Sequence, residues 1–110
     1  MDLNLVILCG RLVGPPEHRT YPSGARLLRL LLTVRSDSPR RRIDVVPVTK
    51  WDPDDDTLAA VEDEGVRLWV TGAIQRRFAD GPLGRTSRLE VVAFQITRRE
   101  TIDEWAGRAG

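Results

Sequence analysis

The most restrictive feature of this chain is a first predicted strand that is apolar on both of its faces. The strand spans residues 4–12, with Val6, Leu8 and Leu12 on one face and Leu5, Ile7 and Cys9 on the other. A strand of this kind is buried on both sides. A chain of 110 residues makes one domain with one core. We therefore expect one face to pack on that core and the other on a second subunit.

Four further strands and one helix are predicted along the chain. The strands span residues 25–35, 43–49, 66–75 and 86–97. In the first of these, Leu28, Leu30, Leu32 and Val34 form an apolar face, and Leu27, Arg29, Leu31, Thr33 and Arg35 form a mixed face. The helix is predicted over residues 52–64. Asp54, Asp55 and Asp56 suit its N-terminus, and Gly65 suits a left-handed C-terminal cap.

Proline and glycine mark the connections between these elements. A loop of about ten residues is bracketed by Pro15, Pro16, Pro22 and Gly24, and residues 36–42 form a basic turn. A hairpin tip is predicted over residues 76–84, around Asp80-Gly81-Pro82 and Gly84. Pro47 cannot donate to a ladder, so we expect an edge position or a bulge there. In the tail, Thr101 and Glu104 have capping-box spacing, which predicts one helical turn.

Five strands with one helix between the third and the fourth predict an all-β fold. This is the order of elements in the oligonucleotide-binding (OB) barrel. The pattern by itself leaves other small barrels open.

Five short motifs, taken in order, resemble one protein family. They are GRL at 10–12, PE at 16–17, PSG at 22–24, GVRLWVTGAI at 65–74 and EVVA at 90–93. Over about residues 4–96 the chain resembles bacterial single-stranded DNA-binding proteins, an OB-fold family. The resemblance implies sequence-independent binding of single-stranded DNA in replication, repair or recombination. It also implies a binding domain over residues 1–98, a short tail over 99–110, and a homo-oligomer, a tetramer first and a dimer second.

The chain departs from this family in its rings and its tail. Family members stack bases on aromatic rings, whereas the matching positions here are Ser38, Ile43, Thr49 and Ala79. The family's long linker and acidic tip have no counterpart before the final EWAGRAG. We therefore expect a divergent, tail-less paralogue, with the primosomal replication proteins as a second possible lineage. The alternative function is a primosome-type or other protein-interaction module with weak or lost DNA binding.

The charges of the chain are separated along the sequence. Seven of its sixteen acidic residues lie within residues 52–64, and the rest of the chain holds nine acids against seventeen bases, sixteen of them arginine. A GC-rich genome favours arginine codons, and phosphate binding favours the guanidinium group. We predict that nucleic acid, DNA or RNA, is bound by Arg29, Arg35, Arg40, Arg41, Arg42, Lys50, Trp51, Arg76, Arg77, Phe78, Arg85 and Arg88.

Three aromatic residues have different predicted roles. Phe78, at the hairpin tip, is the best candidate for stacking on a base. Trp51 either packs at the start of the helix or stacks on a base. Trp69 either packs in a subunit interface or stacks on a base, and packing is favoured because aromatic residues are enriched in interfaces. The predicted oligomer interface therefore consists of Leu5, Ile7, Cys9 and Trp69.

Other functions find little support in the composition. With His18 as the one histidine and Cys9 as the one cysteine, the chain offers no acid–base or nucleophile–base pair, so we expect no enzyme, no cofactor and no metal. Cys9 is interpreted as a small core residue. No apolar run reaches the length of a membrane span and no secretory signal is visible. We therefore expect a cytoplasmic, nucleoid-associated bacterial protein, without membrane contact and with possible replication or repair partners.

Overall fold

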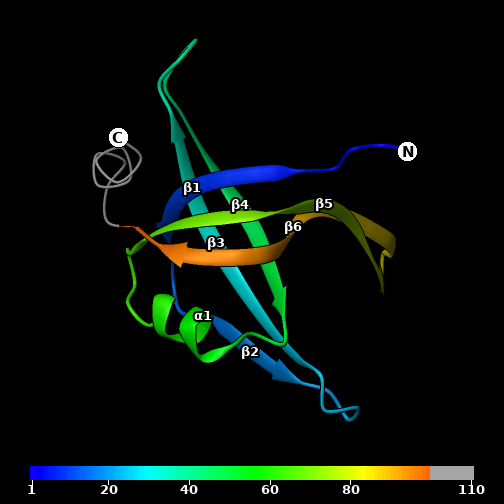
Figure 1. Ribbon diagram of the computed structural model, residues 1–110. Coiled ribbons are helices and arrows are strands. Elements are labelled where there is room, and N and C mark those ends of the chain that lie inside the picture. The colour runs from blue at the N-terminus through cyan, green and yellow to red at the C-terminus, as the bar shows by residue number, and fades with distance from the viewer. Residues whose placement is uncertain (100–110) are drawn as a thin grey trace.

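Six strands and one short helix form the part of the chain, residues 1–99, that the computed structural model describes (Figure 1). The strands are β1 (Val6–Leu12), β2 (Glu17–Thr20), β3 (Arg26–Ser36), β4 (Arg42–Trp51), β5 (Arg67–Gly81) and β6 (Gly84–Arg98). The helix is α1 (Asp55–Ala60), between β4 and β5. The capping-box turn predicted at Thr101 and Glu104 lies outside the described residues.

Five of the six strands close into a barrel, which confirms the predicted OB fold. The strand order is β1-β5-β6-β4-β3-β2, and a further pairing of β1 with β3 closes the ring. That closing pairing is short, with Arg11 opposite Thr33 and Leu12 opposite Leu32. At Gly10, a Cβ atom would lie 2.6 Å from the carbonyl oxygen of Thr33, so a residue without a side chain is needed there. β2 lies outside the barrel, on the edge of β3.

The core fills the barrel with aliphatic side chains and is covered at one end by the helix. Leu28, Leu30 and Leu32 are buried, as their alternation in β3 predicts. Leu27, assigned to the mixed face, is also buried, at 1% exposure. Ala60 and Val61, at the end of α1, belong to the same cluster of buried residues. Each fully buried leucine of this kind stabilises the fold by roughly 1.5–3 kcal/mol.

The loop predicted between Pro15 and Gly24 is wrong in its centre, because Glu17–Thr20 forms strand β2. This strand pairs antiparallel with the first residues of β3, from Thr20 opposite Arg26 to Glu17 opposite Arg29. All four residues of β2 are exposed. Since neither face of β2 is buried, the sequence has no apolar alternation that reveals it.

The predicted helix over residues 52–64 is too long. Its N-cap is as predicted: Asp54 Oδ1 accepts a hydrogen bond from the backbone N–H of Thr57 at 2.8 Å, which lowers the pKa of the Asp54 carboxyl. The helix ends at Ala60, and Gly65 does not cap it. The backbone N–H of Gly65 instead donates to the carbonyl of Leu12 at 2.9 Å. The chain must leave the helix early to reach β1 and begin β5.

The predicted hairpin tip over residues 76–84 is also too long. β5 continues to Gly81 and β6 begins at Gly84, so the turn consists of Pro82 and Leu83 alone. Gly84, the first residue after the turn, has a φ of 106°, which accounts for glycine at this position. The strands extend past the core because their ladder is satisfied by backbone hydrogen bonds, with no need for buried side chains.

β1 is apolar on both faces, but its outward face is uncovered in the single chain. Val6 and Leu8 pack against the core, whereas Leu5 and Ile7 are 57% and 62% exposed. The prediction that Cys9 is a core residue is wrong. Cys9 is half-buried, and its Sγ accepts a hydrogen bond from Arg67 Nη1 at 3.6 Å.

Pro47 lies inside β4, at a position where the strand pairs with β3 on one side and is not paired with β6 on the other. It is opposite Leu31 of β3. The parallel pairing of β4 with β6 consists of Val48 opposite Val91 and Thr49 opposite Val92, so it begins just after Pro47. The missing N–H of proline is therefore tolerated in this position, as an edge location predicts.

Candidate nucleic-acid interface

A groove of about 280 Å³ runs over the outer face of β3 and β4. We call it the β3–β4 groove, and it is lined by Pro15, Glu17, Arg29, Leu30, Leu31, Pro47, Val48, Thr49 and Arg88. Its apolar surface includes the half-exposed Leu31. Arg29 and Arg88 are the cationic lining residues, against one acid, Glu17. Guanidinium groups suit the phosphates of a single nucleic-acid strand, and an apolar surface beside them suits its bases.

A buried polar network lies beside this groove. Glu90 is 4% exposed, and its Oε2 accepts a hydrogen bond from Thr49 Oγ1 at 3.0 Å. Its Oε1 accepts one from Arg77 Nε at 3.1 Å, in an ion pair. A buried carboxylate is costly unless it is paired and hydrogen-bonded. Arg77, predicted to contact nucleic acid, therefore has a structural partner, which Arg88 lacks among the described residues.

Trp51 extends the line of the groove at the end of β4, whereas Lys50, next to it in the strand, alternates to the other face. Alternation along the strand places Pro47, Thr49 and Trp51 on the same face. The Trp51 ring lies 5.7 Å from the ring of Tyr21, tilted by 35°, and is partly exposed. Lys50 Nζ donates to the Trp51 carbonyl at 3.5 Å. Trp51 is thus an aromatic side chain that a nucleic-acid strand in the groove could reach.

The long β3–β4 hairpin carries the densest predicted cationic cluster beyond the barrel (Figure 1). Arg40 and Arg41 lie exposed in its loop. Arg42 begins β4 and pairs with Asp44, with its Nε 3.0 Å from each carboxylate oxygen. A surface ion pair contributes only about 0–1 kcal/mol. Arg42 can therefore exchange Asp44 for a phosphate at low cost.

The β5–β6 hairpin places the other predicted residues on two opposite faces. Arg77 and Arg88 are opposite each other in the ladder and share one face; Phe78, opposite Ser87, projects from the other. Arg76 Nη1 donates to Ser87 Oγ at 3.1 Å. The Arg85 guanidinium lies 4.3 Å from the centre of the Phe78 ring, which is 53% exposed. Phe78 is accessible, but not from the groove face.

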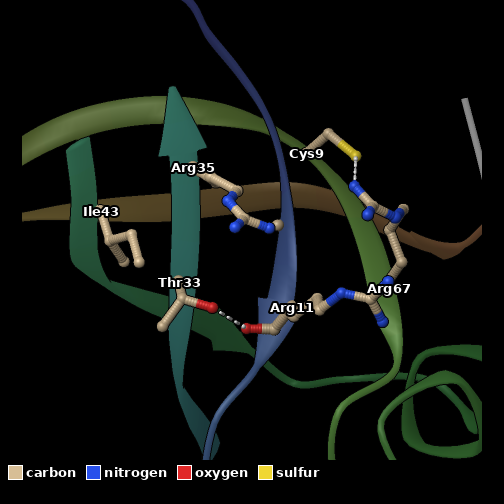
Figure 2. A pocket seen from close by; sticks show the side chains of 7 residues that line it. Cys9, Arg11, Thr33, Arg35, Ile43 and Arg67 are labelled. Carbon is tan, nitrogen blue, oxygen red and sulfur yellow. Dashed lines mark hydrogen bonds between the residues drawn. The ribbon is translucent and has the colours of Figure 1, made fainter. Parts of the chain in front are cut away.

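Arg35 lies apart from the groove, in a second pocket with Arg11 and Arg67 (Figure 2). Arg11 and Arg67 were not among the predicted site residues. Arg11 shares a strand face with Cys9, and Arg67 shares one with Trp69, which indicates that both arginines face outward. That they meet follows from the pairing of β1 with β5.

The four residues predicted at the oligomer interface gather on one outward surface. Cys9 is opposite Trp69 in the ladder, and Ile7 is opposite Thr71. Asn4 anchors the segment before β1 with two hydrogen bonds to the backbone of Ile74, at 2.8 and 2.9 Å. The half-buried Trp69, with Leu5 and Ile7, forms an apolar surface along β1 and β5.

Residues 3–98 match the Single-strand binding protein family. The chain belongs to this family. The single-stranded DNA-binding protein of Streptococcus pneumoniae is 32% identical over 109 residues, which cover 93% of this chain and 70% of the relative. The corresponding protein of Oceanobacillus iheyensis is 30% identical over 111 residues, covering 96% and 69%. These matches confirm the predicted family.

A solved structure is similar in fold. The Plasmodium falciparum SSB complex with ssDNA has a TM-score of 0.75 to this chain, covers 90% of it and 96% of its own length, and is 14% identical. At this level of identity the likeness supports the OB fold alone.

In this member of the single-strand binding family, four positions were predicted to have lost an aromatic residue. Their surroundings in the structure differ. Ser38 and Ala79 are exposed, and Ile43 is 61% exposed. Thr49 is 1% exposed and is held by Glu90. The buried Thr49 hydroxyl therefore stands where the family resemblance implies a ring.

Two features of other classes of protein are not found in the described residues. Within residues 1–99, no three His, Cys, Asp or Glu side chains are grouped so that they could hold a metal ion. None of the helices described in that range is long and apolar enough to pass through a membrane.

Arg77→Ala and Arg88→Ala are expected to have different effects on the stability of the fold. Arg77→Ala leaves Glu90 buried without its cation, so the free energy of unfolding in urea should fall by about 1–3 kcal/mol. Arg88→Ala should change it by less than about 0.5 kcal/mol. The double variant Arg77→Ala/Glu90→Gln should recover part of the loss. An Arg77→Ala variant as stable as the original chain would contradict this role.

Proposed function

We propose that this protein binds single-stranded DNA without sequence specificity, through the β3–β4 groove and the arginines beside it. The observation that carries the proposal is a groove with Arg29 and Arg88 over an apolar surface, on the barrel of a single-strand binding family member. Residues 1–98 act as the binding domain. The protein acts in the bacterial cytoplasm at the nucleoid, in replication, repair or recombination, as a binder and not as an enzyme.

In this proposal the single-stranded DNA is held mainly by electrostatic attraction. Arg29 and Arg88 contact phosphates inside the groove, and the loop arginines Arg40 and Arg41 contact them beyond it. Lys50 adds a cation at the end of β4, while Trp51 stacks on a base there. Stacking contributes about 1–3 kcal/mol per base, so a site with few rings has modest affinity. Phosphate contacts release counterions, which makes binding depend steeply on salt.

The proposal includes a homo-oligomer built on the outward surface of β1 and β5. Among the described residues, β1 pairs with β3 at Arg11 and Leu12 alone, so one edge of the strand before them has no ladder partner. Leu5 and Ile7 beside that edge are more than half exposed. A self-complementary apolar surface of this kind favours a symmetric assembly. A tetramer is the first expectation and a dimer the second.

A protein-interaction module with weak DNA binding is the second candidate. It is favoured by the exposed aliphatic side chains on the outer face of β3 and β4, where Leu31, Ile43 and Val45 are 47–61% exposed. Such a surface suits a protein partner as well as it suits bases. Measured affinity for DNA distinguishes the two candidates.

Binding of poly-dT should be modest at physiological salt and should weaken steeply as salt rises. Each phosphate contact on a single strand adds about 0.7 to the slope of log K against log salt. Fluorescence anisotropy titrations at several salt concentrations measure both the affinity and the slope. An affinity that is nearly the same at low and physiological salt would contradict the charge-based mechanism, and no binding at low salt would favour the interaction module.

Changing Arg40, Arg41 and Arg42 together to alanine should weaken poly-dT binding at low salt by at least tenfold and reduce the salt slope. Each lost contact removes about 0.7 from that slope. Thermal stability should be nearly unchanged, because surface charges contribute little to folding. Arg98→Ala is the control, since Arg98 pairs with Asp63 near the helix, away from the loop. Unchanged affinity in the triple variant would remove this loop from the site.

Light scattering at micromolar concentration should give the mass of a tetramer or a dimer. Trp69→Ala should lower that mass or the stability before it affects DNA affinity, because Trp69 lies on the outward apolar surface. A monomeric mass for the original chain would contradict the assembly. A Trp69→Ala variant that is fully assembled and stable but does not bind would instead assign Trp69 to the DNA site.

A further inference from the structure

A second pocket, of about 410 Å³, opens where β1 leaves β3. We call it the three-arginine pocket; it is lined by Cys9, Gly10, Arg11, Thr33, Arg35, Ile43 and Arg67. Arg35 extends from β3 towards β1, while Arg11 and Arg67 lie together on the β5 side of β1 (Figure 2). The closing pair of the barrel, Arg11 opposite Thr33, forms one end of the pocket.

The pocket holds three positive charges with no negative charge among its lining residues. The four ion pairs within residues 1–99 involve Arg19, Arg42, Arg77 and Arg98, and none of the three pocket arginines. Arg11 and Arg67 are also directly opposite each other in the β1–β5 ladder. Like charges in such cross-strand pairs destabilise a sheet. An anion in the pocket would offset this repulsion.

The guanidinium groups have donors that no acceptor within residues 1–99 uses. Arg11 gives one hydrogen bond, from Nη1 to the carbonyl of Gly65 at 3.0 Å. Arg67 gives one to the Cys9 sulfur, a weak acceptor, and its Nε is buried without a hydrogen-bond partner among the described residues. Arg35 makes no hydrogen bond or ion pair within residues 1–99. Since each guanidinium has five N–H donors, most of this capacity remains open to a ligand.

Phosphate is the anion that fits these donors best. Its oxygens accept two parallel hydrogen bonds from one guanidinium group, in a geometry that arginine matches. The pocket is separate from the β3–β4 groove, but the two share the outer face of β3. Arg29 and Leu31 line the β3–β4 groove, and Thr33 and Arg35 follow on the same face of β3. Arg35 lies six positions after Arg29, or about 20 Å at the rise of a strand.

We propose that the three-arginine pocket is a phosphate-binding site, and that a single DNA strand leaving the β3–β4 groove along β3 places a phosphodiester group in it. The first part stands on the pocket itself. The second part rests on the proposed DNA binding. The site therefore extends the DNA path from the groove to the junction of β1 and β3.

The first arm of the test uses inorganic pyrophosphate and the full chain in a low-salt chloride buffer. Pyrophosphate should raise the melting temperature and shift the NMR signals of the arginine Nε–H groups of Arg11, Arg35 and Arg67. Arg35→Gln should weaken both effects at least fivefold; this side chain is exposed, so the variant should fold. Arg98→Gln, the matched control, should respond like the original chain. An equal response from Arg35→Gln and the original chain would overturn the site.

The second arm compares oligo-dT of about 4 and about 16 nucleotides, the range bound by single OB folds. Arg35→Gln should reduce the salt slope by about 0.7 for the longer oligonucleotide. It should not change the slope for the shorter one, which fills the groove alone. Suppose that the original chain binds pyrophosphate, but that Arg35→Gln and the original chain have equal salt slopes with the longer oligonucleotide. This result would show that the phosphate in the pocket does not come from the DNA strand.

Two further results keep this proposal separate from the others. If the original chain binds neither oligonucleotide, the proposed function fails, while the pyrophosphate arm still decides whether the pocket is a phosphate site. Light scattering of Arg35→Gln is run in parallel. A changed mass without any pyrophosphate effect would show that the pocket is a contact between subunits, and would overturn the phosphate site.

Discussion

The short pairing of β1 with β3 is the contact on which the other features of this structure depend. Two residue pairs close the barrel, and they approach so closely that Gly10 cannot carry a side chain. Closure gives Leu12 and Leu32 their buried positions and leaves the outer face of β3 available beside β4. The same short pairing leaves the rest of β1 with an unpaired edge. The groove, the three-arginine pocket and the apolar outward surface all follow from it.

Charge is distributed over this barrel in a way that separates folding from binding. The acidic segment 52–64 contains α1, which covers one end of the barrel, while the arginines within residues 1–98 lie on the strands and hairpins. Of the arginines near the groove, Arg77 is held by the buried Glu90, whereas Arg88 makes no ion pair within the described residues. Arginines with and without such partners have the same appearance in a sequence. Their roles differ because desolvation makes a paired buried charge structural and leaves an exposed one for a ligand.

The Thr49–Glu90–Arg77 network gives the position of Thr49 a role in the fold of this chain. Thr49 is almost fully buried, and its hydroxyl is used by a carboxylate, so the position contributes to packing. In the proposed function, the loss of stacking is balanced by arginines from three parts of the surface. A site of this composition is more sensitive to salt than one built on rings.

The sequence by itself determined the family, the five barrel strands, the N-cap at Asp54 and the outward face of β1. Each depends on a local pattern, such as apolar alternation or a capping residue next to its helix. Only the tertiary structure decided that Glu17–Thr20 is a strand, that the helix ends at Ala60, and that Arg77 pairs with Glu90. It also placed Arg11, Arg35 and Arg67 around one pocket. These features depend on backbone pairing and on contacts between distant residues, which leave no periodic signal along the chain.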